Sequence, residues 1–140
     1  MKKLLATMMA IVSLISIAVL PAAASGGDPE NDVMPCYEYT NNTVTSLSIS
    51  ANGVATATSK LSGYRNLTTK INIYMYLERK VDGEWVAIDS WWADENTYSL
   101  TLEETFSVDS GFTYRIRASY YAYSGIDFEH IEEYSREVTY

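Results

Sequence analysis

The sequence is poor in the residues from which catalytic and metal centres are most often built. It has one histidine, His130, and one cysteine, Cys36, among its 140 residues. Histidine is the commonest general base near neutral pH, and zinc sites need several histidine or cysteine ligands. A glycine-rich phosphate loop and a dense Asp-x-Asp-x-Asp calcium loop are also missing. We therefore expect a non-enzymatic protein that holds no metal and no other cofactor.

A single cysteine also excludes a disulfide within one chain, so the hydrophobic core alone must stabilise the fold. Two states of the Cys36 thiol remain open. It stays unpaired, or it joins two chains in a Cys36-linked homodimer.

Positive charge is scarce as well, with ten Lys and Arg against eighteen Asp and Glu. Nucleic acids and anionic membranes select clustered Lys and Arg, so neither is an expected partner. The balance suits an extracellular protein, or one that binds cations or basic surfaces.

The N-terminus has the pattern of a secretory signal peptide. Lys2 and Lys3 precede an apolar run from Leu4 to Leu20, and small residues follow Pro21. The run is shorter than the roughly 20 apolar residues that span a bilayer. We expect a signal peptide over residues 1–24, cleaved near Ala24, and a secreted protein without membrane contact afterwards. Residues 25–35, rich in Gly, Pro and acidic residues, are the expected flexible leader.

Residues 36–140 are the right length for one domain, and their apolar residues alternate with period two. Ile71, Ile73, Met75 and Leu77 share one face of a predicted strand, and Asn72, Tyr74, Tyr76 and Glu78 share the other. Asn52-Gly53 and Asp82-Gly83 are strong hairpin signals. After Trp85, the residues Trp85, Ile88 and Trp91 can all face inward only if the strand contains a bulge. Glycines that interrupt the alternation mark further turns, where a positive φ would let the chain reverse.

Seven alternating segments separated by six turns predict an all-β fold, a single antiparallel immunoglobulin-like or fibronectin-III-like sandwich. No segment has helical periodicity. The expected strands are 44–50, 54–61, 69–79, 85–93, 97–108, 112–123 and 128–139.

The stretch from Val108 to Ala118 resembles the corner between the fifth and sixth strands of fibronectin type III domains. In that family an apolar residue, a turn and a tyrosine six positions later form a tyrosine corner. Val108 and Tyr114 take those places, and Ser110 stands where the family usually has proline. The resemblance implies that the Tyr114 hydroxyl bonds to the backbone a few residues upstream.

Residues 36–140 are also similar to a group of small uncharacterised secreted proteins of Gram-positive bacteria. The likeness lies in Tyr39-Thr40-Asn41, Asn52-Gly53, the strand from Lys70 to Leu77 and the segment from Trp85 to Trp92. It implies a bacterial source and no known role.

Acidic pairs are the remaining catalytic candidates, because paired carboxylates can hydrolyse glycosides. Adjacent residues on a strand face opposite sides, so Glu103-Glu104 and Glu132-Glu133 should be split across their sheets. Asp94-Glu95-Asn96 is a weak calcium candidate. His130 is expected to be a solvent-facing strand residue.

The outward-facing aromatics give the best functional hint. If strands 69–79 and 112–123 are neighbours, one sheet face carries a stripe of Tyr and Arg with Trp91 or Trp92 at its border. Such a face could stack sugar rings or anchor a protein partner, or it could simply be a stable exposed surface. The predicted binding residues are Tyr74, Tyr76, Arg115, Arg117, Tyr121, Tyr123 and Trp92.

We therefore expect a secreted binding module for an extracellular glycan or a surface protein. The alternative is a structural, self-associating matrix protein that uses Cys36 dimers or exposed sheet edges.

Overall fold

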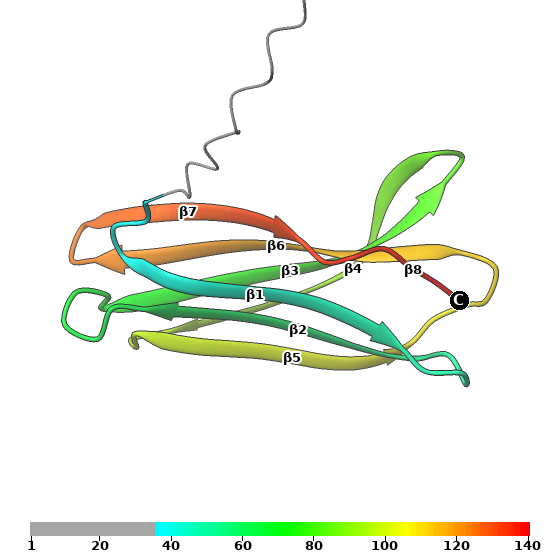
Figure 1. The fold of residues 1–140 in the computed structure, drawn as a ribbon, viewed down its shortest axis with the longest axis horizontal. Helices are drawn as coiled ribbons and strands as arrows, with labels where there is room; N and C mark the ends of the chain where they lie inside the picture. Colours follow the sequence, from blue (N-terminus) through cyan, green and yellow to red (C-terminus); the bar gives the residue numbers. More distant parts are fainter. Residues whose placement is uncertain (1–35) are drawn as a thin grey trace, which may run out of the picture. The chain divides into compact units, whose positions relative to one another are not determined.

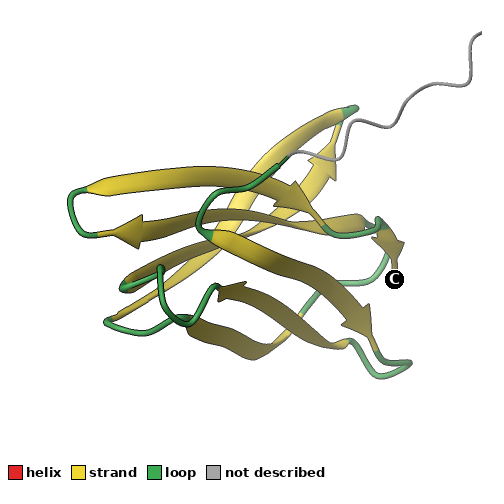
Figure 2. Ribbon diagram, turned by 60° about the vertical axis from the view of Figure 1, so that its left-hand side comes forward, coloured by secondary structure: helices red, strands yellow, loops and turns green. Residues whose placement is uncertain are grey.

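The computed structural model describes residues 36–140, and this range is all-β (Figures 1 and 2). The predicted signal peptide and leader lie outside the described residues. No helix long and apolar enough to cross a membrane occurs in the described range. The strands are β1 (Thr40–Ile49), β2 (Val54–Gly63), β3 (Lys70–Val81), β4 (Glu84–Glu95), β5 (Ser99–Ser107), β6 (Thr113–Ser124), β7 (Asp127–Tyr134) and β8 (Val138–Thr139).

The strands form two antiparallel sheets, which confirms the predicted all-β sandwich. One sheet has the order β1-β2-β5, and the other has the order β4-β3-β6-β7, with β8 also paired to β6. Strands β3 and β6, the predicted neighbours, pair directly over ten residue positions from Lys70 to Arg79.

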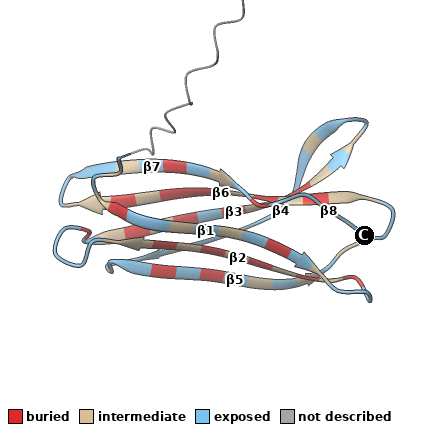
Figure 3. Ribbon diagram, viewed as in Figure 1, coloured by how far each residue is buried: buried red, intermediate tan, exposed pale blue. Residues whose placement is uncertain are grey.

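The core lies between the two sheets and follows the predicted alternation (Figure 3). From Ile71 to Leu77 and from Tyr114 to Ala122, every second residue is buried in the core, because successive side chains of a strand point to opposite faces. Burial of each large apolar side chain stabilises the fold by roughly 1.5–3 kcal/mol. The inward residues of these two strands are Ile71, Ile73, Met75, Leu77, Tyr114, Ile116, Ala118, Tyr120 and Ala122.

Strand β4 contains a bulge, but the bulge does not turn Trp85 and Ile88 into the core: Trp85 lies against Arg115 on the outer face, and Ile88 is 42% exposed. Leu77 pairs with Asp89 and Glu78 pairs with Ala87, so Ile88 has no partner on β3. Trp91 packs inward and stacks on Phe106 of the other sheet, with ring centroids 4.8 Å apart. Trp92 consequently points outward, which decides between the two tryptophans at the border of the face.

The last predicted strand, 128–139, is divided into β7 and β8. Ser135, between them, is buried, and its Oγ accepts a hydrogen bond from Ile116 N at 2.9 Å. A side-chain oxygen thus takes a place in the ladder beside β6, and regular pairing resumes only at Val138.

Gly63 is one of the glycines that were expected to mark a turn with positive φ, but it has a different role. Gly53 and Gly83 have positive φ values of 78° and 90°, as hairpin turns require, but Gly63 is not among the positive-φ glycines. A Cβ at Gly63 would lie 2.2 Å from Thr68 Oγ1. The glycine is needed there because the loop after β2 packs directly against its backbone.

The tyrosine corner is present. Tyr114 is 1% exposed, and its hydroxyl donates to Asp109 O at 2.8 Å. We predict that Tyr114→Phe lowers the free energy of unfolding by about 1–3 kcal/mol, because the Asp109 carbonyl loses a buried partner. Denaturant unfolding measures this. Tyr98→Phe, at an exposed tyrosine that bonds only Arg65, is the control and should change stability little. Equal losses would contradict the role of the corner.

Tyr120 predicts a loss of stability at alkaline pH. It is fully buried, its hydroxyl donates to Val44 O at 2.8 Å, and burial raises its pKa above 10.0. The folded state then holds this proton more tightly than the unfolded state. The free energy of unfolding should therefore fall as pH rises above 10.0, the ordinary pKa of tyrosine.

Unfolding titrations at increasing pH test this, and Tyr120→Phe should show a shallower decline because it lacks the titrating group. Parallel declines in the two proteins would show that other tyrosines are responsible.

Candidate functional site

The seven predicted binding residues lie on the outer face of the β4-β3-β6-β7 sheet. Tyr74 is opposite Trp92 on β4, and Tyr76 is opposite Arg117 on β6. The outward positions of β6 are every second residue and also include Arg115, Tyr121 and Tyr123. The predicted parity of these strands therefore holds at each position of the stripe.

Strand β7 adds residues that the sequence reasoning left out of the face. Phe128 pairs with Tyr123, His130 with Tyr121, and Tyr134 with Arg117. His130 is exposed, as predicted, but it also stacks on Tyr121 at 4.5 Å between ring centroids, and its Nε2 lies 2.6 Å from Ser119 Oγ. In the sequence, the only indication that β7 contributes to this face is the alternation of Phe128, His130, Glu132 and Tyr134.

One half of the outer face is occupied by ion pairs between its own side chains. Glu78 is 5% exposed and accepts hydrogen bonds from Arg115 Nε at 2.7 Å and Arg117 Nε at 2.8 Å. The bond to Glu78 raises the pKa of Arg117 above its ordinary value. One buried carboxylate thus binds the guanidinium groups of two residues that are two positions apart on β6 and face the same side of the sheet.

Aromatic rings cover these guanidinium groups. Arg115 lies 4.2 Å from the ring centroid of Trp85 and 4.3 Å from that of Tyr134, and Arg117 lies 4.2 Å from that of Tyr76. Such contacts stabilise exposed pairs by about 0.5–1 kcal/mol each. We call this group the arginine clasp; its members are Glu78, Arg115, Arg117, Tyr76, Trp85 and Tyr134.

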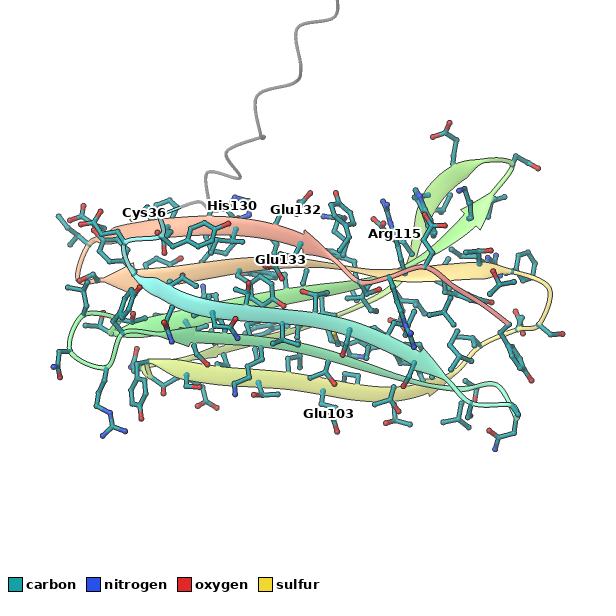
Figure 4. The ribbon with its side chains drawn as sticks, viewed as in Figure 1. Cys36, Glu103, Arg115, His130, Glu132 and Glu133 are labelled. Atoms are coloured by element: carbon teal, nitrogen blue, oxygen red, sulfur yellow. The ribbon has the colours of Figure 1, made fainter. Side chains whose placement is uncertain are left out.

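Glu132 borders the clasp. The Tyr134 hydroxyl donates to Glu132 Oε1 at 2.6 Å, and this bond lowers the pKa of Glu132 and raises the pKa of Tyr134. Arg117 also lies 3.6 Å from the Glu132 carboxylate. Figure 4 shows Arg115, His130 and Glu132 along this sheet. Side chains of the clasp thus bind one another.

The other half of the face is open. Trp92 is 66% exposed, Phe128 57% and Tyr74 36%. Tyr121 lies between them, 6.0 Å from Tyr74 and 5.9 Å from Phe128 by ring centroids. We call Trp92, Tyr74, Tyr121 and Phe128 the aromatic row; it crosses all four strands of the sheet, from β4 to β7.

A shallow groove of about 230 Å³ lies beside the row. Asn72 contributes a buried Oδ1 atom that has no hydrogen-bond partner within residues 36–140. The side chain of Asn72 also places an amide in the wall of the groove. The lining residues are Asn72, Tyr74, Tyr76, Ser119, Tyr121 and Tyr123.

The acidic candidates are not brought together as a catalytic pair. Glu132 faces outward, whereas Glu133 accepts hydrogen bonds from Thr43 and, at 3.2 Å, from Thr45. Glu103 lies in the other sheet, on β5 (Figure 4). No group of three His, Cys, Asp or Glu that could hold a metal occurs among the described residues.

A second hollow, of about 530 Å³, lies at the start of β7 between Glu38, Tyr39 and residues 126–129. It is larger than the groove, but the Glu129 carboxylate in its wall already accepts hydrogen bonds from the protein backbone. The Glu129 carboxylate accepts from Glu38 N at 2.6 Å and from Tyr39 N at 3.1 Å, which fixes the segment that leads into β1. We therefore place the candidate site at the aromatic row and its groove. Cys36, two residues before Glu38 in the chain, is exposed and forms no disulfide. The Cys36-linked homodimer stays a prediction.

No protein-family model and no curated protein matches this sequence.

The arginine clasp predicts a large effect for one carboxylate. Glu78→Gln should lower the free energy of unfolding by about 1.5–3 kcal/mol, because one acceptor oxygen is replaced by an NH2 donor that faces an arginine, and both guanidinium groups lose their negatively charged partner. Glu132→Gln is the control: this carboxylate is exposed, and its loss should cost no more than about 1 kcal/mol. Denaturant unfolding compares the two variants, and equal effects would show that Glu78 does not hold the clasp together.

Proposed function

We propose that this protein is a secreted, non-catalytic binding module that recognises an extracellular glycan through the aromatic row and its groove. The observation that carries the proposal is the row itself: three well-exposed rings on one sheet face, beside a groove with an unpaired amide. Sugar rings stack their apolar faces on aromatic side chains, and their hydroxyls need polar partners at the edges. Row and groove supply both.

The division of the face supports a binding role for only part of the predicted stripe. Tyr76, Arg115 and Arg117 are engaged within the clasp, so we assign them to stability and to shaping the groove. Tyr74, Tyr121 and Trp92 remain as ligand-contacting candidates, with Phe128 added from β7. Tyr123 contacts Phe128 at 5.6 Å and lines the groove.

We also infer that the sandwich is of the fibronectin type III kind. The strand orders β1-β2-β5 and β4-β3-β6-β7 support this class, as does the bond from Tyr114 to Asp109 O. A secreted location is supported by the sequence of residues 1–24, and the resemblance to Gram-positive proteins is consistent with a cell-wall ligand.

The test is a pull-down of the purified protein with insoluble cell wall and a panel of polysaccharides, followed by tryptophan fluorescence titration. We expect saturable binding that changes the fluorescence of Trp92. Tyr74→Ala should weaken binding about tenfold, the usual scale for a central aromatic contact, and leave folding intact.

Tyr98→Ala is the matched control, because Tyr98 has the same 36% exposure and precedes β5 in the other sheet. Equal losses in both variants would argue against the row. Absence of binding to any glycan would overturn the proposal and favour a surface protein as the ligand.

A further inference from the structure

The lysines and arginines of the β4-β3-β6-β7 sheet all lie close to carboxylates. Each lysine and arginine of β3 and β6 lies within 4.0 Å of an acidic partner, so neither strand offers a free cation to a phosphate or carboxylate of a ligand. The pairs are Lys70–Asp94 at 3.0 Å, Arg79–Asp109 at 3.7 Å, Lys80–Glu137 at 4.0 Å, Arg115–Glu78 at 2.7 Å and Arg117–Glu78 at 2.8 Å.

The carboxylates near the row are engaged in the same way, by Lys70 at Asp94 and by Tyr134 and Arg117 at Glu132. Neither Asp94 nor Glu132 is therefore free to pair with a cationic ligand. Several rings already hold cations of the protein itself, with Arg117 over Tyr76 at 4.2 Å and Lys70 over Tyr123 at 5.9 Å. Trp92, Tyr74 and Phe128 have no such contact within residues 36–140.

The row also has a direction. Trp92 and Tyr74 are cross-strand partners, and Tyr121 and Phe128 continue the line on β6 and β7. Each step advances by one strand, so three steps cover at least about 14 Å at the usual spacing of 4.7–4.9 Å between strands. A ligand that contacts the whole row must be an extended chain that lies across the strands.

We infer that the ligand is an uncharged, hydroxyl-rich glycan chain that runs across β4, β3, β6 and β7 along the aromatic row. This inference rests on the proposed function and specifies its ligand. Asn72 lines the groove near the middle of the row and offers its amide to a ligand hydroxyl there. Trp92 and Phe128 hold the two ends of the chain, and Tyr74 holds the centre.

The experiment compares neutral and acidic oligosaccharides by tryptophan fluorescence and calorimetry. The probes are cello- and N-acetylated chito-oligosaccharides, each from dimer to hexamer, and oligogalacturonates of the same lengths. For at least one neutral series we expect affinity to rise with length up to the span of the row. That affinity should be nearly the same at about 50 mM and about 500 mM NaCl, because no ion pair forms with the ligand.

Three variants test the assignment of the row. Trp92→Ala and Phe128→Ala should each weaken hexamer binding about tenfold and weaken dimer binding much less. Asp94→Asn, which releases the half-buried Lys70, should leave neutral hexamer binding unchanged and raise the affinity for oligogalacturonate. Tyr98→Ala again serves as the matched control.

The outcomes separate the two proposals. Binding that prefers oligogalacturonate, falls steeply with salt, or does not depend on chain length would overturn this inference and leave glycan recognition standing. Wild-type hexamer binding by both Trp92→Ala and Phe128→Ala would do the same. If the polysaccharide panel also shows no binding, the proposed function itself fails.

Discussion

The pairing of β3 with β6 fixes both the core and the candidate site. Ten consecutive positions pair between Lys70 and Arg79 on β3, and the pleat sends alternate residues to opposite faces. The alternate residues from Ile71 to Leu77 fill the core, so Asn72, Tyr74 and Tyr76 must point outward. A register slip of one residue would expose the inward residues of β3 and bury the tyrosines, so the packing of the core specifies which residues lie on the outer face.

Glu78 extends this constraint to electrostatics. A buried carboxylate without a partner is costly, and here the cost is offset by two arginines two positions apart on β6. The arrangement stiffens one half of the face while using up its positive charge. The half that remains free is aromatic and nearly neutral although the whole chain is acidic, with a formal charge of −8. The stiffness of one half of the face and its lack of free positive charge thus have one origin.

Much of this architecture is readable from the sequence, because period-two alternation is a local property. The strands and the inward residues of β3 and β6 follow from residues close to one another in the chain, and the bond from Tyr114 was implied by the resemblance of Val108–Ala118 to a tyrosine corner. The bulge in β4 is present, but the reason expected for it was wrong, because Trp85 lies on the outer face. Trp91 and Trp92 were separable only once Phe106 stood opposite one of them. The division of the last strand depends on Ser135, whose Oγ takes a ladder position.

The arginine clasp was beyond local reasoning. Glu78 and Arg115 are separated by 37 residues, and their contact depends on the register between β3 and β6. Pattern reading placed Arg115 and Arg117 on the outer face without revealing that a buried carboxylate already holds them. The same limit applies to Gly63, whose requirement comes from the approach of Thr68. Contacts between distant segments decide which exposed residues are free to act.

The bulge at Ile88 has a consequence for the behaviour of the protein at high concentration. β4 is an edge strand of its sheet, and a long regular edge invites a second chain to add to it and begin aggregation. The unpaired residue interrupts the edge in mid-strand and increases its local twist, so a straight partner strand cannot pair along its full length. A chain without an internal disulfide to hold it closed is thereby guarded against polymerisation through the strand that carries Trp92.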